Sequence, residues 1–195
     1  MRPVVSVFEA VYGADGGLAL SLRHEVGVHG PGRAPPVRDV FPAEVVISVS
    51  LPPVPLCVGG EGGERKQNGP RGAEADVVVV GKPDERYVMV SSRNDTILDM
   101  PSPGGGNGSA KSDPIVNYGL DRATGRLEAL QEVPCGGRFP RHFALSRAGS
   151  LLAVAVQKDG RVAVLRRDPA TGRLGAAPVA YADVGGEVTS VIFDE

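Results

Sequence analysis

The chain has 195 residues, of which 27 are Gly and 17 are Pro, and this many helix-interrupting residues excludes a long helical bundle. Hydrophobic residues make up 42% and charged residues 23%, as in ordinary globular proteins, which excludes a wholly disordered chain. The net charge of -2 offers no overall attraction to nucleic acid or to an anionic membrane, so we expect neither as a partner.

The first 75 residues carry weak structural signals. Residues 1–28 contain the turn Tyr12–Leu20, which faintly echoes a turn that recurs further along the chain, and they are expected to form a partial blade. Residues 29–75 are rich in Pro and Gly and end in the polar run Glu61–Arg71, so we expect an insertion or linker that is partly disordered. Val45–Leu51 has strand propensity but matches no part of the repeat, and its structure stays open.

The cysteines and the N-terminal sequence indicate the cellular compartment in which we expect the protein. Cys57 and Cys135 form no CxxC pair, so the sequence indicates neither a metal cluster nor a disulfide framework. The N-terminal apolar run is broken by Glu9 and is too short for the core of a signal peptide. We therefore expect a soluble, cytoplasmic protein that needs no metal or other cofactor.

A repeat organises the rest of the chain. Asp121–Leu127 (DRATGRL) recurs as Asp168–Leu174 (DPATGRL) at a spacing of 47 residues, a period typical of propellers and solenoids. Pro83–Asp95 likewise corresponds to Arg147–Asp159, and the low-complexity loop Pro101–Ala110 accounts for its longer offset.

Each repeat contains four short apolar segments separated by turns, which predicts one four-stranded antiparallel blade per repeat. The first predicted blade consists of Val77–Val80, Tyr87–Val90, Ile115–Tyr118 and Leu127–Val133, and the second of Arg141–Leu145, Leu151–Val156, Arg161–Arg166 and Pro178–Val184. Val188–Phe193 is predicted to be the inner strand of a further blade. Residues 76–195 are thus expected to form two blades plus that strand.

Three motifs, in order and at blade spacing, resemble the seven-bladed β-propeller lactonase family. Ser91–Asp95 resembles its SNRG-type strand end, Pro140–Leu145 its PRHFAL strand, and Val154–Gln157 its ANQ strand. The family includes bacterial-type 6-phosphogluconolactonases and fungal muconate-lactonising enzymes. The resemblance implies an all-β, partial propeller of about three blades of the family's seven.

Four candidate site residues are expected at one edge of the blades. In an antiparallel pair the start of one strand lies beside the end of the next, which places Arg141 and His142 near Gln157, with Arg93 at the equivalent strand end one blade earlier. A guanidinium group binds phosphate or carboxylate through two parallel hydrogen bonds, and a hydrogen-bond donor stabilises an oxyanion. Arg141 and Gln157 are therefore candidate substrate-binding residues. Arg93, which matches the family's catalytic arginine, and His142, a candidate general base, are the candidate catalytic residues.

Each candidate also has a structural interpretation. Arg93 could pair with Asp95 at the surface, His142 could be a hydrogen-bonded histidine on a strand face, and Gln157 could join blades. Arg141 could point away from the channel, since the side chains of an inner strand alternate between its two sides. The basic residues between Arg138 and Arg173 are interpreted as a solvated strand face.

Two functions of different class stay open. One is hydrolysis of a sugar-acid lactone such as 6-phosphogluconolactone by activated water. The other is a truncated, non-catalytic propeller fragment that acts as a binding or scaffold surface. The resemblance places the family's catalytic His, Glu and second Arg on blades that this chain lacks, which favours the second function, and open blade edges predict self-association.

Overall fold

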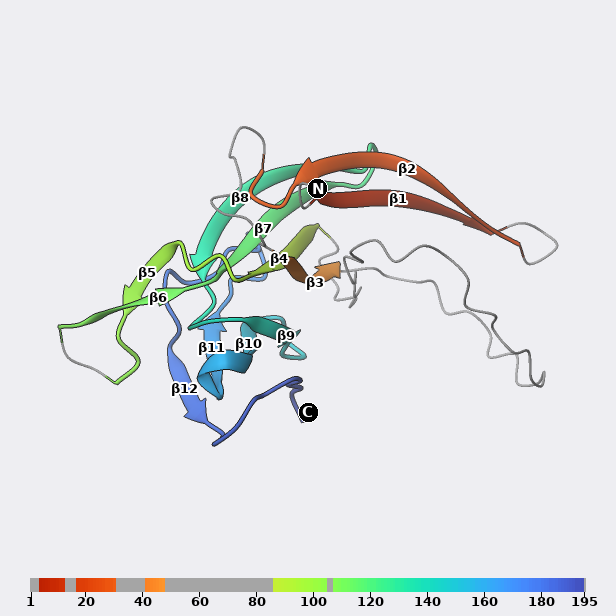
Figure 1. The fold of residues 1–195 in the computed structure, drawn as a ribbon. Coiled ribbons are helices and arrows are strands. Elements are labelled where there is room, and N and C mark those ends of the chain that lie inside the picture. Colours follow the sequence, from red (N-terminus) through yellow and green to blue (C-terminus); the bar gives the residue numbers. More distant parts are fainter. Residues whose placement is uncertain (1–3, 13–16, 31–40, 48–85, 105–106, 195) are drawn as a thin grey trace, which may run out of the picture.

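The computed structural model describes residues 4–12, 17–30, 41–47, 86–104 and 107–194, in which every regular element except the short 3-10 turn η1 is a β-strand (Figure 1). The elements in chain order are β1 (Val4–Tyr12), β2 (Leu18–Gly27), β3 (Phe41–Ile47), β4 (Tyr87–Arg93), β5 (Leu98–Pro101), β6 (Ser109–Ser112), β7 (Pro114–Asp121), β8 (Arg126–Pro134), β9 (Pro140–Leu145), β10 (Leu151–Val156), η1 (Gln157–Asp159), β11 (Arg161–Arg166) and β12 (Ala180–Asp183). Two four-stranded antiparallel sheets dominate, which confirms the predicted all-β, partial propeller. In these ranges no helix could cross a membrane.

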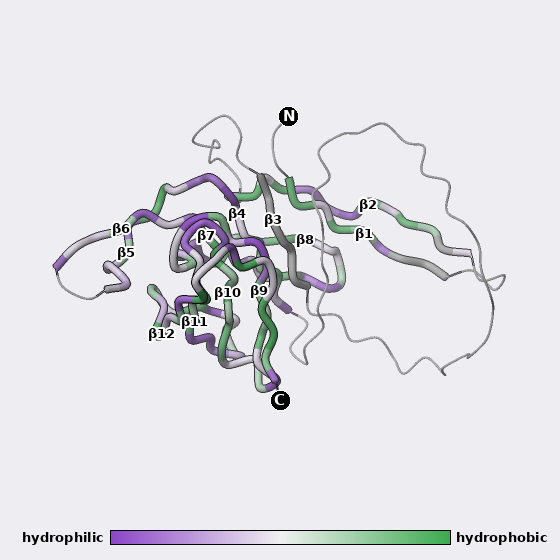
Figure 2. The backbone as a smooth tube through the Cα atoms, turned by 60° about the horizontal axis from the view of Figure 1, so that its bottom comes forward, coloured by the Kyte–Doolittle hydropathy of each residue, from purple (hydrophilic) through white to green (hydrophobic). Residues whose placement is uncertain are grey.

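The C-terminal sheet is one complete blade with the strand order β9-β10-β11-β12. All four strands were predicted, and the register pairs Leu152 of β10 with Leu145 of β9 and Leu165 of β11. Five of the six residues of β10 are buried, in agreement with its unbroken apolar run, and Figure 2 shows hydrophobic residues along β9 and β10.

The middle sheet has the order β3-β4-β7-β8, and its inner strand comes from an unexpected place. Strands β4, β7 and β8 match the predicted segments, but β3 pairs with β4 over Phe41–Ile47, inside the region expected to be an insertion or linker. Val77–Val80, which was predicted for this blade, lies outside the described residues. The blade therefore takes its inner strand from a segment far upstream of β4.

The loop between β4 and β7 contains a small hairpin. Strands β5 and β6 pair from Leu98 opposite Ser112 to Pro101 opposite Ser109, and the hairpin projects from the body of the molecule (Figure 1). The insertion predicted here thus extends outward and leaves the pairing of β4 with β7 intact.

The repeated turns have the same local structure in both blades. The carboxylate of Asp121 accepts the N–H of Ala123 at 2.9 Å and the hydroxyl of Thr124 at 2.6 Å. Asp168 accepts the equivalent bonds at 2.9 Å and 2.8 Å, four residues before Gly172. Such aspartate turns compete well with regular structure, which explains why the Asp-x-Ala-Thr-Gly pattern ends a strand.

The glycine of each repeated turn contacts the preceding sheet. A Cβ atom at Gly172, where φ is +70°, would lie 2.4 Å from the ring of Tyr87 at the start of β4. The hydroxyl of Tyr87 also donates a hydrogen bond to the carbonyl of Ala170 at 2.7 Å. Similarly, a Cβ atom at Gly125 would lie 2.9 Å from Cβ of Arg23 on β2. The turn is thus a contact between successive sheets as well as a chain reversal.

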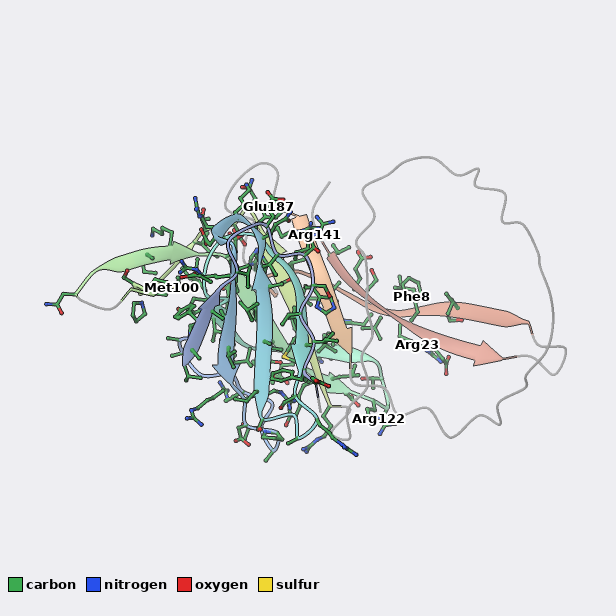
Figure 3. All side chains as sticks on the ribbon, turned by 90° about the horizontal axis from the view of Figure 1, so that it is seen from below. Phe8, Arg23, Met100, Arg122, Arg141 and Glu187 are labelled. Carbon is green, nitrogen blue, oxygen red and sulfur yellow. The ribbon has the colours of Figure 1, made fainter. Side chains whose placement is uncertain are left out.

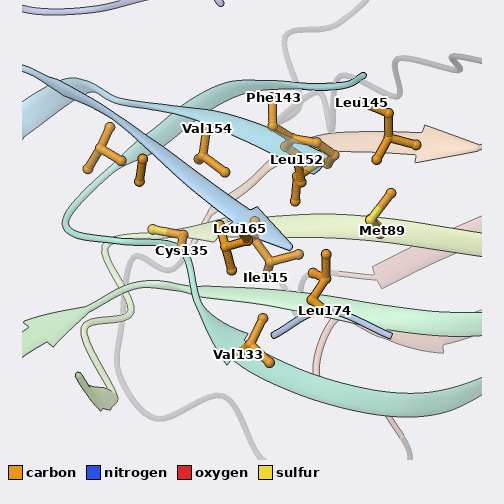
Figure 4. Close-up of a cluster of buried hydrophobic side chains, with 12 residues drawn as sticks. Met89, Ile115, Val133, Cys135, Phe143, Leu145, Leu152, Val154, Leu165 and Leu174 are labelled. Atoms are coloured by element: carbon orange, nitrogen blue, oxygen red, sulfur yellow. The ribbon is translucent and has the colours of Figure 1, made fainter. Parts of the chain in front are cut away.

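The middle sheet separates two apolar clusters. Met89 of β4 and Ile115 of β7 face the C-terminal blade, where they join the larger cluster (Figure 4). The neighbouring residues Val88, Val90 and Val116 face the β1–β2 hairpin and belong to the smaller cluster. Because both faces of β4 and β7 are covered, their sequences are almost continuously apolar where they cross the core.

The predicted inner strand Val188–Phe193 is not a strand in the structure. Residues 184–194 contain no regular element, although they lie against β9, where the N–H of Val191 donates to Nδ1 of His142 at 3.3 Å. A strand forms its backbone hydrogen bonds with a neighbouring strand. Among the described residues no strand pairs with Val188–Phe193.

The β1–β2 hairpin extends away from the two larger sheets (Figure 3). Val5 is buried in the smaller cluster at its base, whereas Phe8 is 53% exposed, Leu20 61% and Leu22 56%. Phe8 is the register partner of Leu22, and both lie on the face opposite Val5. Among the described residues β1 pairs only with β2, so an exposed apolar face adjoins an open strand edge.

We expect the chain to self-associate as its concentration rises, because an open edge beside an apolar face favours pairing between copies. Substitution of Phe8 by lysine should shift the sedimentation profile toward the monomer. Val179, an exposed valine near β12, gives the matched control Val179→Lys, which should leave the profile unchanged. A monomer throughout the concentration series of the unmodified chain would show that the edge does not pair.

Candidate functional site

Three strand ends meet at one edge of the two large sheets. β4 ends at Arg93, β9 begins directly after Phe139, and Gln157 follows β10. The N–H of Gln157 donates to the carbonyl of Phe139 at 3.0 Å, and the guanidinium carbon of Arg93 lies 5.3 Å from the centroid of the Phe139 ring. The structure thus brings two predicted site residues, Arg93 and Gln157, to the same place through Phe139.

Arg141 lies at an irregularity in the pairing of β9 with β10. His142 is opposite Ala155 and Pro140 is opposite Val156, so Arg141 is the extra residue of a β-bulge. A bulge re-aims the side chain that it carries, and Arg141 is exposed. Its guanidinium therefore projects into solvent at the edge where Arg93 and Gln157 lie.

The C-terminal segment 184–194 contacts the other two candidates. Nδ1 of His142 accepts the Val191 N–H, so the neutral ring keeps its proton on Nε2, and Nδ1 is not available as a proton acceptor. The amide of Gln157 donates to the carboxylate of Glu187 at 2.8 Å. Figure 3 shows Arg141 and Glu187 at one end of the sheets, far from Arg122 at the other.

An open pocket of about 390 Å³ adjoins this edge. Phe139 forms one of its walls, and two cations contact the ring of Phe139, because Nζ of Lys158 lies 4.5 Å from the ring centroid and Arg93 approaches it as well. Cations are attracted to the face of an aromatic ring, which orients them without neutralising their charge. The lining residues are Asn94, Thr96, Lys111, Asp113, Arg138, Phe139 and Lys158.

The three cations that line the pocket differ in how far they are neutralised. Arg138 forms an ion pair with Asp159 at 2.6 Å, and the hydrogen bond to that carboxylate raises the pKa of Arg138. Lys111 pairs with Asp99 at 3.1 Å. Lys158 forms no ion pair with any residue that the structure describes, so its charge remains to attract an anion.

A buried carboxylate forms the floor of the pocket. Asp113, at the start of β7, is fully buried and accepts the backbone N–H groups of Asn94 at 3.0 Å, Asp95 at 2.8 Å, Thr96 at 2.5 Å and Phe139 at 2.7 Å. Four N–H groups occupy both of its oxygens. The negative charge is thereby balanced by backbone dipoles, and the carboxylate is not free to act as a base.

A second buried group joins the hairpin to this region. The side chain of His29 is only 3% exposed, and its ring nitrogens lie 3.0 Å from the Asp95 carboxylate and 2.9 Å from the Glu132 carboxylate. Hydrogen bonds to these two carboxylates raise the pKa of His29 to about 9. His29 is therefore a buried cation at neutral pH, and the carboxylate of Asp95, which the sequence suggested as a surface partner of Arg93, is buried and pairs with His29.

Sequence reasoning missed Asp113, Phe139 and Lys158. Lys158 belongs to the basic residues that were interpreted as a solvated strand face, and it is exposed, but it also lines the pocket. A usable signal was present for Phe139, because the pair Gly136–Gly137 lies shortly before it in the loop that leads into the motif-bearing strand β9, and such a pair indicates a special backbone geometry. No group of three potential metal-binding side chains occurs among the described residues.

Comparison with known proteins is consistent with this architecture. A curated 6-phosphogluconolactonase of Formosa agariphila is 29% identical over 114 residues, which cover 58% of this chain and 27% of that protein. The periplasmic gluconolactonase PpgL of Pseudomonas aeruginosa superimposes with a TM-score of 0.59 at 19% identity, covering 96% of this chain and 36% of that one. The chain therefore spans about a quarter to a third of the length of these relatives.

The family assignment rests on a match over most of the chain. The family model described as "Lactonase, 7-bladed beta-propeller" matches residues 64–193, a range that contains all three motifs and both repeated turns. Together with the four-stranded antiparallel blades, this match shows that the chain belongs to the seven-bladed β-propeller lactonase family.

Proposed function

We propose that the pocket binds the anionic group of a sugar-acid lactone, such as 6-phosphogluconolactone, as the arginine-bearing part of a lactonase site. The observation that carries the proposal is the convergence of Arg93 and Lys158 on the Phe139 ring beside the pocket. Membership of the lactonase family and the name of the curated relative support the choice of ligand.

The chemistry of lactone hydrolysis suits these groups. Water adds to the carbonyl carbon, negative charge develops on the carbonyl oxygen, and the ring C–O bond then breaks to give a carboxylate and a hydroxyl. A guanidinium stabilises such an oxyanion, or a phosphate on the same sugar, through two parallel N–H bonds. Arg93 is oriented for this by Phe139, and Lys158 adds a point charge on the same ring.

A specific observation favours the second function, a binding fragment without turnover. Activation of water needs a proton acceptor, and the two obvious candidates near the pocket are occupied. Asp113 accepts four backbone N–H groups, and Nδ1 of His142 accepts the Val191 N–H. In this arrangement Arg93 and Lys158 supply electrostatic stabilisation and anion binding, but neither Asp113 nor Nδ1 of His142 supplies a base.

We expect Arg93→Ala to weaken the binding of 6-phosphogluconate, the stable hydrolysed acid, by roughly tenfold or more, because a charge-assisted bond to the anion is lost. Lys158→Ala should weaken binding less, by roughly threefold, since a single exposed charge contributes less. Isothermal titration calorimetry measures both. Arg122→Ala removes an exposed arginine far from the site and is the control. Equal affinities for the Arg93 and Arg122 variants would contradict the proposal.

Hydrolysis of 6-phosphogluconolactone by the same variants separates the two functions. Turnover above the uncatalysed rate that disappears in Arg93→Ala would support an enzyme, with a base supplied outside the residues discussed. Hydrolysis at the background rate, with intact affinity for the acid, would support a binding fragment. The two measurements are independent because binding an anion requires no proton acceptor.

A further inference from the structure

The side chain of Asp113 joins the inner parts of the two large blades at the pocket, next to the Ser112 hydroxyl, which accepts the N–H groups of Gly136 and Gly137 at 3.2 Å. The loop after β4 contributes the N–H groups of Asn94, Asp95 and Thr96, and the loop before β9 contributes that of Phe139. The two loops belong to different sheets, and the pairing of strands does not fix their relative position.

The backbone at these donors is strained. Asn94 has φ of +63°, Thr96 of +35° and Phe139 of +66°, and these are the only residues other than glycine with positive φ among those that the structure describes. All three donate their N–H groups to Asp113. A β-branched residue such as Thr96 adopts positive φ only when its surroundings compel it. The coincidence indicates that the buried carboxylate imposes these conformations.

The neighbouring blade shows a weaker form of the same arrangement. Asp159 lies two residues before the start of β11, whereas Asp113 directly precedes β7, and Asp159 accepts the N–H of Arg138 at 2.6 Å. Asp159 also binds the Arg138 side chain and is partly exposed, so it does not collect a set of strained backbone donors. The fourfold coordination of Asp113 is therefore particular to the pocket.

We propose that Asp113 is a positioning residue, which holds Arg93 against Phe139 and so presets the anion-binding geometry. Arg93 directly precedes the Asn94–Thr96 donors, and Phe139 is itself a donor, so one carboxylate fixes both partners of the 5.3 Å contact between cation and ring. The proposal rests on the proposed function for its consequence in ligand binding, but not for its structural statement.

The test uses Asp113→Asn, which preserves the size of the side chain but replaces one acceptor oxygen with an NH₂ donor that opposes the backbone N–H groups. Two readouts are independent of any ligand. Amide hydrogen exchange at Asn94, Thr96 and Phe139 should accelerate at least tenfold, whereas exchange within β10 should not change. The NMR signals of the Arg93 side chain should also lose the ring-current shift that the Phe139 ring produces.

The matched control is Asp121→Asn, an exposed aspartate that accepts turn hydrogen bonds at a distance from the pocket. It should leave the Arg93 signals and the exchange of the Asn94, Thr96 and Phe139 amides unchanged. If Asp113→Asn does not fold, amide hydrogen exchange in the unmodified chain still tests the role of Asp113. Protection of these loop amides comparable to that of strand amides supports the proposal, and rapid exchange overturns it.

Binding of 6-phosphogluconate tests the consequence of the Asp113 interaction for ligand binding. Asp113→Asn should weaken binding by about as much as Arg93→Ala, and the double variant should be no weaker than Arg93→Ala alone, because both changes remove the same interaction. Additive losses would mean that Asp113 acts only through general stability and would overturn the positioning role. If the ligand-free readouts change while 6-phosphogluconate binds to none of the proteins, the proposed function fails and the structural role of Asp113 stands.

Discussion

Gly172→Ala is expected to lower the free energy of unfolding by about 3 kcal/mol, the sum of a left-handed backbone penalty and an overpacked contact. The new Cβ atom would lie 2.4 Å from the ring of Tyr87, and the backbone at Gly172 has φ of +70°. Tyr87 cannot easily move aside, because its hydroxyl binds the carbonyl of Ala170 in the same turn. Urea denaturation followed by circular dichroism measures the loss.

Gly185→Ala separates the two contributions. Gly185 has nearly the same φ, +71°, but a Cβ atom there would meet nothing within 4 Å. We expect a loss of about 1 kcal/mol, which represents the backbone penalty alone. Equal losses for the two variants would show that the contact between Tyr87 and the repeated turn does not constrain the sheets.

The stability of the protein should fall as the pH rises from about 6.5 through about 9, because His29 binds a proton more tightly in the folded chain. A raised pKa in the folded state means that stabilisation is complete below the unfolded value of 6.5 and is lost above the folded value of about 9. The rise in the pKa of His29 on folding contributes about 3 kcal/mol to the free energy of unfolding at low pH, because each pKa unit corresponds to about 1.4 kcal/mol. Neutral His29 would no longer offer a positive charge to the carboxylates of Asp95 and Glu132, which lie 3.0 Å and 2.9 Å from its ring nitrogens.

His29→Gln should therefore be less stable than the unmodified chain at pH 6, and the difference should shrink toward pH 10. Thermal or urea unfolding at half-unit pH intervals provides the profile. His24→Gln, on the hairpin strand β2, is the control for the loss of a histidine from the hairpin. A constant difference between His29→Gln and the unmodified chain would rule out a proton bound by His29 as its source.

The fold was predictable where its signals are local. Strands β9 to β12 and β4, β7 and β8 are short apolar runs bounded by turns, and the recurring DxATGRL sequence fixed their spacing. The inner strand β3 was not predictable in the same way. Phe41–Ile47 joins β4 by pairing across about 40 residues of the chain, so the sequence offers only strand propensity.

The candidate site was predictable to the level of strand ends. The antiparallel rule placed Arg93, Arg141, His142 and Gln157 at one edge, because the sequence motifs mark where strands begin and end. Asp113 was missed because the inserted hairpin separates it from β4, and because its partners are backbone N–H groups, which leave no trace in residue type. The hydrogen bond from Val191 to His142 was missed because Val188–Phe193 was expected to form a strand.

The inner strand of the middle blade has a consequence for how this chain folds. About 40 residues separate the end of β3 from the start of β4, whereas β9 and β10 are joined by a tight turn. Bringing two strands together across the longer separation in sequence costs about 2 kcal/mol more in chain entropy. The chain loses this entropy before β3 forms its first hydrogen bond with β4. We therefore expect β4, β7 and β8 to pair first, which leaves the inner edge of β4 exposed for a time. During that interval, a free strand edge beside buried valines is a site where two nascent chains can pair wrongly, and the rate at which β3 arrives then governs the yield of folded protein.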